Sequence, residues 1–209
     1  MNNLILLRHG QSQWNLENRF TGWKDVPLTA NGIEEAKLAG QLMKHNNITV
    51  DIIFSSILER ANKTAELAIK EMNQSSLWKH NQLVMTRDKR LNERDYGELV
   101  GLNKEETAKK FGKEQVHIWR RSYNIPPPGG ESLENVVERV KPYYQKYIEP
   151  EIKNEQNVLI VAHGNSLRAS MIHVGLYKAA EISKIEIPTG SPFVITYEEG
   201  KIISTKYLS

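Results

Sequence analysis

Residues 4–10 read LILLRHG, and residues 158–164 read VLIVAHG. Each stretch is a short, continuous apolar run that ends in a His-Gly pair. Such a run, closed by a turn signal, is typical of a strand that is buried on both faces of a parallel sheet. A third run, residues 51–56, is rich in residue types that favour strands. These three runs predict the centre of one sheet.

Helical patterns lie between the predicted strands. Pro142 falls inside the third of these patterns and is expected to kink that helix or to mark its true beginning. The four helices predicted from apolar spacing and capping residues are residues 33–45 with Thr29 as cap, residues 57–72, residues 132–152 begun by Ser132, and residues 166–175.

Two late strands complete the pattern, over residues 192–197 and 202–207, with a turn at 198–201. Strands that alternate with helices indicate an α/β fold, a mostly parallel central sheet with helices on both faces. A length of 209 residues, with 39% hydrophobic and 25% charged residues, suits one soluble globular domain over residues 1–209.

Charge and composition exclude several classes of function. The chain has 28 Lys and Arg against 25 Asp and Glu, a balance unlike that of a nucleic-acid-binding protein. The absence of cysteine excludes disulfides, thiolate zinc sites and cysteine nucleophiles. No apolar stretch approaches the roughly 20 residues of a membrane helix, and the first residues lack the basic start of a signal peptide. We therefore expect a cytoplasmic protein without a membrane partner.

The two strand-end histidines predict one shared site. Ligands of open parallel sheets bind beyond the carboxyl ends of the strands, so His9 and His163 face each other if their strands are neighbours. Gly10 and Gly164 let the backbone turn sharply and approach a ligand closely. The helix after each pair points free N–H groups at the same place, which favours an anion.

Arg8 stands directly before His9, and this pairing points to phosphate chemistry. Arginine binds phosphate through two hydrogen bonds. Its charge also disfavours protonation of His9, leaving a neutral ring nitrogen that can attack phosphorus. Two other interpretations stay open: that His9 and His163 are hydrogen-bonded core residues, and that they bind a metal. The metal interpretation has only two ligands and no accompanying ligand spacing.

The short segment LRHGQS, residues 7–12, resembles the signature of the histidine phosphatase superfamily. Longer segments resemble the 2,3-bisphosphoglycerate-dependent phosphoglycerate mutases, and the matches run in order from residue 4 to about residue 193. These segments are RHGQSQWN at 8–15, NRFTGW at 18–23, LNERDYG at 91–97, GLNK at 101–104, WRR at 119–121 and AHGNSLR at 162–168.

The resemblance implies catalytic roles that suit the residue types. His9 would carry the phosphoryl group, and Arg8, Arg60 and His163 would hold it and stabilise the transferring group. Glu93 would be the general acid and base for the substrate hydroxyl, its pKa tuned toward neutral by burial and by the incoming phosphate. The alternative for Glu93 is a surface ion pair with a neighbouring arginine, Arg90 or Arg94.

The resemblance also implies how the rest of the substrate is bound. Lys104, Arg120 and Arg121 would bind the anionic groups that His9 does not, and we expect the adjacent arginines in an ordered lid. The alternative for that basic pair is a solvated helix face. Besides Arg8, Arg60 and Glu93, the implied substrate-binding residues are Ser12, Asn15, Thr21, Gly22, Tyr96, Lys104, Arg120, Arg121, Gly164 and Asn165.

The implied activity is the interconversion of 2-phosphoglycerate and 3-phosphoglycerate in glycolysis and gluconeogenesis. It would be primed by 2,3-bisphosphoglycerate, need no metal, and take place in a homodimer. The second hypothesis is a phosphomonoesterase of the same superfamily, favoured by the short connection around residues 126–130. The third is a catalytically inert binding module, against which the intact set of catalytic residue types speaks.

Overall fold

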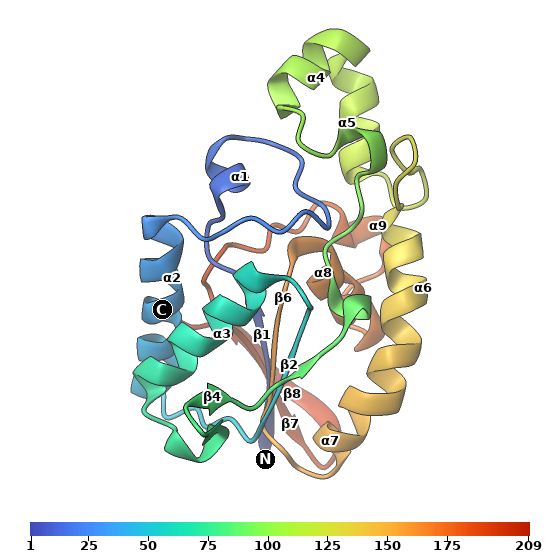
Figure 1. Ribbon diagram of the computed structural model, residues 1–209. Coiled ribbons are helices and arrows are strands. Elements are labelled where there is room, and N and C mark those ends of the chain that lie inside the picture. Colours follow the sequence, from blue (N-terminus) through green and yellow to red (C-terminus); the bar gives the residue numbers. More distant parts are fainter.

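A six-stranded sheet forms the centre of the computed structural model, which describes all residues from Met1 to Ser209 (Figure 1). Its strand order is β5-β2-β6-β1-β7-β8. β5, β2, β6 and β1 are mutually parallel, whereas β7 runs antiparallel to both β1 and β8. The strands are β1 (Asn2–Arg8), β2 (Ile52–Ser55), β5 (Thr86–Arg87), β6 (Val158–Ala162), β7 (Phe193–Glu198) and β8 (Lys201–Tyr207), and a separate hairpin pairs β3 (Trp78–Lys79) with β4 (Gln82–Leu83).

Helices cover both faces of this sheet, as the sequence predicts. Alternate residues of β1 and β6 divide between two large apolar clusters, because successive side chains of a strand point to opposite faces. One cluster lies under α2 and α3, and the other under α6 and α8 (Figure 1). The α-helices are α1 (Gln13–Leu16), α2 (Ala30–His45), α3 (Glu59–Met72), α4 (Lys104–Phe111), α5 (Lys113–Arg121), α6 (Leu133–Tyr143), α7 (Glu149–Lys153), α8 (Gly164–His173) and α9 (Ala179–Ile182).

The predicted helix over residues 132–152 is confirmed as one helical stretch from Leu133 to Lys153, in which the type of turn changes. Ser132 caps its start as expected, and α6 then ends at Tyr143. A π-helical segment, Tyr144–Ile148, separates α6 from α7. Pro142 lies inside α6 and does not begin a helix. Because proline has no N–H to donate to the preceding turn, the regular hydrogen-bond ladder is interrupted where the wider turn begins.

The helical arm, which we define as residues 104–121 with α4 and α5, stands beyond the carboxyl ends of the parallel strands (Figure 1). The sequence patterns do not predict these two helices. Asn103 caps α4 by accepting hydrogen bonds from the N–H groups of Glu105 and Glu106. Gly112, with a φ of 90°, separates α4 from α5. The arm therefore lies over the edge of the sheet where the sequence predicts a site.

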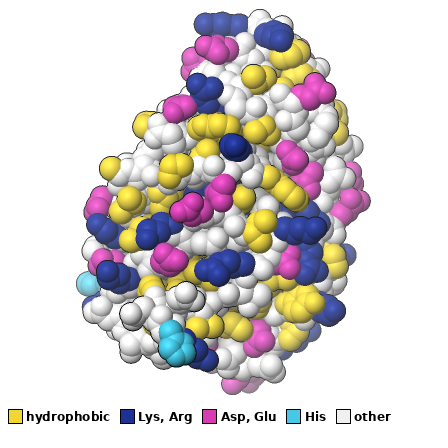
Figure 2. Space-filling view, in the orientation of Figure 1, with side chains coloured by type: hydrophobic (Ala, Val, Ile, Leu, Met, Phe, Trp, Pro, Cys, Tyr) yellow, Lys and Arg dark blue, Asp and Glu magenta, His cyan; other side chains and the backbone are white.

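No helix of the structure is long and apolar enough to cross a membrane. Lys and Arg side chains alternate with Asp and Glu over the face seen in Figure 2.

Candidate active site

His9 and His163 lie side by side because the strands that precede them are neighbours. β1 and β6 pair in parallel, with Arg8 opposite Ala162. The two imidazole ring centroids are 4.9 Å apart, which confirms the expected juxtaposition. His9 is 3% exposed and His163 is fully buried. The first turn of α8 follows His163 directly, so its N–H groups begin beside this pair.

The His9 ring is held in one tautomer. Its Nδ1 lies 2.7 Å from the carbonyl oxygen of Gly10, which can only accept, so Nδ1 carries the proton and Nε2 is left with a free lone pair. Burial, with the charges of Arg60 and Arg8, lowers the pKa of His9 well below its usual value. The imidazole is therefore neutral, as predicted, and nucleophilic at Nε2.

Gly10 has a packing role that the sequence does not predict. A Cβ at this position would lie 2.1 Å from the carbonyl oxygen of Gly32 in the first turns of α2. The glycine is therefore required for close contact between the strand end and α2.

Two arginines beside His9 present unpaired nitrogens in a buried corner. Arg60, in the first turn of α3, is 1% exposed and donates to the carbonyl oxygens of Gly22 and Lys24. Arg8 donates to the carbonyl oxygen of Ile187 at 2.7 Å. The Nε atoms of both arginines are buried without a partner. Burial lowers the pKa of Arg60 to about 10, so it remains a cation at neutral pH. Unpaired buried N–H groups on two cations favour an anion.

Glu93 is buried and held through one oxygen. Its Oε1 accepts from Arg94 N at 2.7 Å, from Asn165 Nδ2 at 2.9 Å and from Asn165 N at 3.2 Å. Its Oε2 has no hydrogen bond within the protein. Burial raises the pKa of this carboxyl, but these N–H donors and the charges of Arg8 and Arg60 outweigh burial and lower it. Burial alone therefore does not move this pKa toward neutral in the ligand-free protein, and the expected tuning also depends on a bound phosphate.

The alternative of a surface ion pair for Glu93 is also wrong. Arg90 pairs with Asp88 instead, at 2.7 Å. The guanidinium of Arg94 stacks on the Tyr96 ring, 4.7 Å from its centroid. Arg94 is 1% exposed and keeps two nitrogens without a partner.

Arg139 of α6 fixes the backbone around Glu93, a role with no recognisable sequence signal. Its guanidinium donates to the carbonyl oxygens of Arg90, Asn92 and Glu93. It also makes two hydrogen bonds to the Glu131 carboxylate, at 2.8 and 2.9 Å. The Trp23 indole donates to the carbonyl oxygen of Glu93 at 2.6 Å. This loop is therefore held rigidly although it has no regular secondary structure.

A cavity of about 70 Å³ opens beside His9. All of its lining residues except Arg19 and Phe20 are among the predicted site residues. Arg19 lies within residues 18–23, a segment that resembles the mutases, and this resemblance is the sequence feature that indicates a role at the site. The cavity is lined by Arg8, His9, Asn15, Arg19, Phe20, Thr21, Gly22, Arg60, Glu93, Tyr96 and Lys104.

Three further predicted residues support this cavity from outside. Ser12 is fully buried and caps α1 through Asn15. Gly164 and Asn165 form the first turn of α8, where Asn165 binds Glu93. A Cβ on Gly164 would lie 3.7 Å from Glu93 Oε2 and 3.2 Å from a nitrogen of Arg168. A Cβ at position 164 would therefore be tight against Arg168 and only in ordinary contact with the Glu93 carboxylate.

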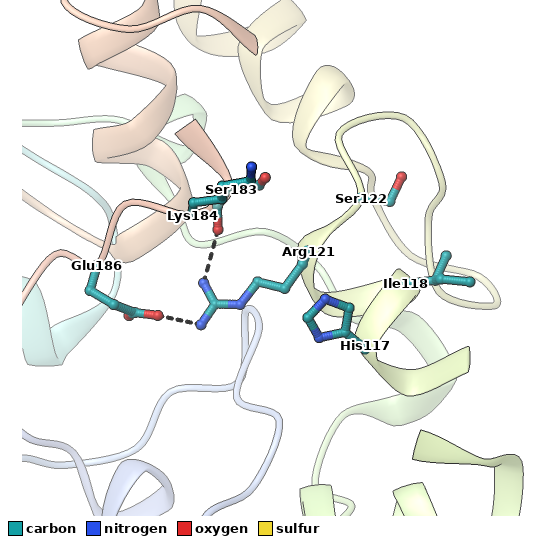
Figure 3. Close-up of a pocket in the computed structure, with 7 residues that line it drawn as sticks. All are labelled: His117, Ile118, Arg121, Ser122, Ser183, Lys184 and Glu186. Carbon is teal, nitrogen blue, oxygen red and sulfur yellow. Dashed lines mark hydrogen bonds and ion pairs between the residues drawn. The ribbon is translucent and has the colours of Figure 1, made fainter. Parts of the chain in front are cut away.

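The structure does not bring Arg120 and Arg121 to the cavity beside His9. Arg121 extends from the end of α5 toward Ser183 and Glu186, donating to the Ser183 carbonyl oxygen at 3.2 Å and forming an ion pair with the Glu186 carboxylate (Figure 3). These residues line a different cavity of about 460 Å³. Arg120 is exposed overall, and partial desolvation of its guanidinium lowers its pKa. Arg121 therefore does not lie on a freely solvated helix face, whereas Arg120 is exposed.

The structure contains no group of three or more His, Cys, Asp or Glu side chains arranged to hold a metal ion. The buried side-chain nitrogens without a partner around this site belong to Arg8, Arg60, Asn92, Arg94 and His163. Their chemistry suits an anion.

Curated relatives match almost the whole chain. A protein of Mesorhizobium japonicum named 2,3-bisphosphoglycerate-dependent phosphoglycerate mutase is 47% identical over 203 residues, covering 97% of this chain and 96% of its own length. A protein of Bartonella henselae with the same name is 49% identical, with the same coverage.

Solved structures with the same fold include both mutases and phosphatases. A phosphoglycerate mutase from Bacillus anthracis has a TM-score of 0.79 at 24% identity, covering 99% of this chain and 92% of that one. The alpha-ribazole phosphatase from Shigella flexneri has a TM-score of 0.78 at 25% identity, covering 99% and 95%. Residues 4–208 match the family described as Histidine phosphatase superfamily (branch 1). The chain belongs to this superfamily.

Proposed function

We propose that this chain interconverts 2-phosphoglycerate and 3-phosphoglycerate through a phosphohistidine at His9. The observation that carries the proposal is the buried, neutral imidazole of His9 beside the unpaired Nε atoms of Arg8 and Arg60. The choice of substrate is supported by relatives 46–49% identical that are named as 2,3-bisphosphoglycerate-dependent phosphoglycerate mutases. The fold alone would suit a phosphatase equally well, because phosphatases share it.

His9 attacks phosphorus with Nε2 while the P–O bond to the glycerate oxygen breaks, and that oxygen leaves as a hydroxyl with a proton from Glu93. Its Nδ1 keeps its proton and donates a hydrogen bond to the Gly10 carbonyl oxygen throughout, so positive charge on the phosphorylated ring is stabilised where it forms. Arg8, Arg60 and the N-terminus of α8 neutralise the charge on the equatorial oxygens. This supplies the positive charge that the transfer needs.

The residues around His9 fit 2,3-bisphosphoglycerate, which bears two phosphates and a carboxylate. Arg8 and Arg60 would hold the phosphate nearest His9, and Lys104 lies in the same cavity for a further anion. Asn15, Thr21, Gly22 and Tyr96 supply neutral hydrogen-bonding groups along that cavity. When bound, 2,3-bisphosphoglycerate supplies the phosphoryl group that primes His9.

Glu93 accepts the proton of the substrate hydroxyl on its Oε2 atom and later returns it. Oε1 is fully occupied by three N–H donors, so only Oε2 is free to accept a proton. The lowered pKa makes Glu93 a carboxylate, hence a base, before substrate binds. An anion bound beside it raises the pKa again, which lets the same oxygen return the proton.

Arg120 and Arg121 would reach the substrate after a movement of the helical arm. In the ligand-free protein Arg121 is bound to Glu186, so a substrate anion would have to replace that carboxylate. We also expect a cytoplasmic homodimer that acts on phosphoglycerates without a metal. Sedimentation of the purified protein would test the dimer.

The decisive assay measures 2-phosphoglycerate formed from 3-phosphoglycerate, with and without catalytic amounts of 2,3-bisphosphoglycerate. We expect strong stimulation, and one phosphoryl adduct on His9 by mass spectrometry. His9→Ala should lose both, whereas His45→Gln, a change of an exposed histidine, should lose neither. Release of inorganic phosphate faster than isomerisation would instead support the phosphomonoesterase. Absence of the adduct would rule out both enzymatic hypotheses.

A further inference from the structure

Ser56 makes a hydrogen bond to His163 that the catalytic scheme above does not use. Ser56 follows β2, and His163 follows the adjacent parallel strand β6, with Ser55 opposite Val161. The register thus brings the Ser56 hydroxyl to 2.8 Å from His163 Nε2. Both residues are fully buried, so no solvent competes for this hydrogen bond.

The direction of this hydrogen bond follows from how the hydroxyl is otherwise occupied. Ser56 Oγ already accepts the N–H of Leu58 at 3.2 Å. Its single proton has one acceptor within reach, which is His163 Nε2. If Nε2 were instead the donor, the serine proton would be buried without an acceptor, which is costly. The serine therefore donates, and His163 carries its ring proton on Nδ1.

His163 Nδ1 belongs to the ring beside His9, next to the expected phosphoryl site. It is buried and has no partner in the protein, like the Nε atoms of Arg8 and Arg60. The His9 ring is its neighbour, at 4.9 Å between centroids. With a proton on Nδ1, His163 offers a third donor to the phosphoryl oxygens. With a lone pair there, it would repel them.

We infer that Ser56 is a positioning residue that fixes the Nδ1–H tautomer of His163, so that His163 donates a hydrogen bond to the phosphoryl group transferred to and from His9. The tautomer stands independently of the proposed function. Its use in phosphoryl transfer rests on that function.

The tautomer can be measured directly on the full chain. Long-range ¹H–¹⁵N correlation spectra at neutral pH distinguish protonated from unprotonated ring nitrogens, and a His163→Gln variant assigns the signals. We expect Nδ1–H in the unmodified protein and a mixture of tautomers in Ser56→Ala. Ser55→Ala is the matched control, because Ser55 is equally buried but donates to the Val161 carbonyl oxygen instead. A protonated Nε2 in the unmodified protein, or an unchanged tautomer in Ser56→Ala, would overturn the inference.

Kinetics then test the consequence. Ser56→Ala should lower kcat by about 10- to 100-fold, as expected when the residue orienting an active-site histidine is lost. KM should change by less than about threefold, because the phosphate-binding cations remain. Ser56→Thr keeps the hydroxyl and should retain most of the kcat of the unmodified protein. If Ser56→Ala does not fold, Ser56→Thr still tests whether the hydroxyl is sufficient. A fall in kcat equal to that of Ser55→Ala would mean a merely structural role. If the mutase assay fails for every form of the protein, the spectra still decide the tautomer.

Discussion

The site combines two regions that are built very differently. The phosphate corner, which we define as Arg8, His9, Arg60 and His163, is anchored on the ends of the central strands and on α3. Each of its side chains is buried or bound to backbone carbonyl oxygens or to a buried hydroxyl. The helical arm instead rests on a small apolar cluster with three buried members, Phe20, Leu99 and Val116. The clusters under the sheet contain 22 and 17.

We expect the phosphate corner to carry out phosphoryl transfer and the helical arm to control the entry of the substrate. The corner is rigid and preorganised for a phosphoryl group, a property that stabilises transition states effectively. The cavity over it, about 70 Å³, is far below the roughly 300–1,000 Å³ of small-molecule pockets. Segments with few buried contacts open most easily. We therefore expect the arm to move when substrate binds, and changes in the two regions to affect different kinetic constants.

Arg60→Lys should have the largest effect. Lysine keeps the charge but cannot bind the Gly22 and Lys24 carbonyl oxygens while also presenting a donor to phosphate. We expect kcat to fall by about 10²- to 10³-fold with a smaller change in KM. Steady-state kinetics would show this, with Arg87→Lys, a change of an exposed arginine, as the control. A fall confined to KM would contradict the division between the two regions.

Lys104→Met tests the arm in the same way. Lys104 lies at the start of α4 and lines the cavity beside His9, and burial lowers its pKa. Loss of a desolvated, charged hydrogen bond of about 1.5–3 kcal/mol would raise KM by about 10- to 100-fold. We expect kcat to stay within about threefold. Lys109→Met, an exposed change on the same helix, should alter neither constant.

The corner is also the part that the sequence predicts best. Apolar runs ending in His-Gly are local signals, and parallel pairing brings any two such ends to one edge. The pairing of Arg121 with Ser183 and Glu186 joins positions more than 60 residues apart, so no local pattern contains it. The π-helical segment after Pro142 is similar: the proline signals an interruption, but tertiary packing decides whether the chain bends, stops or widens its turn.

The free energy of unfolding should decrease at acid pH because His9 and His163 are buried. The pKa values of His9 and His163 are lowered, by burial first and then by Arg60 and other nearby charges, below the 6.5 of a free histidine. Below that pH the unfolded chain binds more protons than the folded one. The free energy of unfolding therefore decreases as pH falls, by up to about 1.4 kcal/mol per pH unit for each histidine.

Urea unfolding between about pH 5 and pH 7 would measure this slope. His163→Gln should reduce the slope by one histidine's share relative to the unmodified protein. An equal slope in His163→Gln and the unmodified protein would show that His163 has the same pKa in the folded and the unfolded chain, which would contradict the lowering of its pKa by burial.

The smallest expected effect concerns Glu186, which binds Arg121 away from the cavity in the ligand-free protein. Glu186 is 67% exposed and Arg121 29% exposed in their side chains, so their ion pair is worth at most about 1 kcal/mol. If a substrate anion must replace the Glu186 carboxylate, Glu186→Gln should lower KM by about two- to fivefold and leave kcat unchanged.

This decrease in KM should be smaller at high ionic strength, because salt weakens the exposed ion pair between Glu186 and Arg121. Glu199→Gln makes the same charge change on an exposed turn and should alter neither KM nor kcat. A higher KM in Glu186→Gln would mean the reverse, that Glu186 holds Arg121 in the position from which it binds substrate.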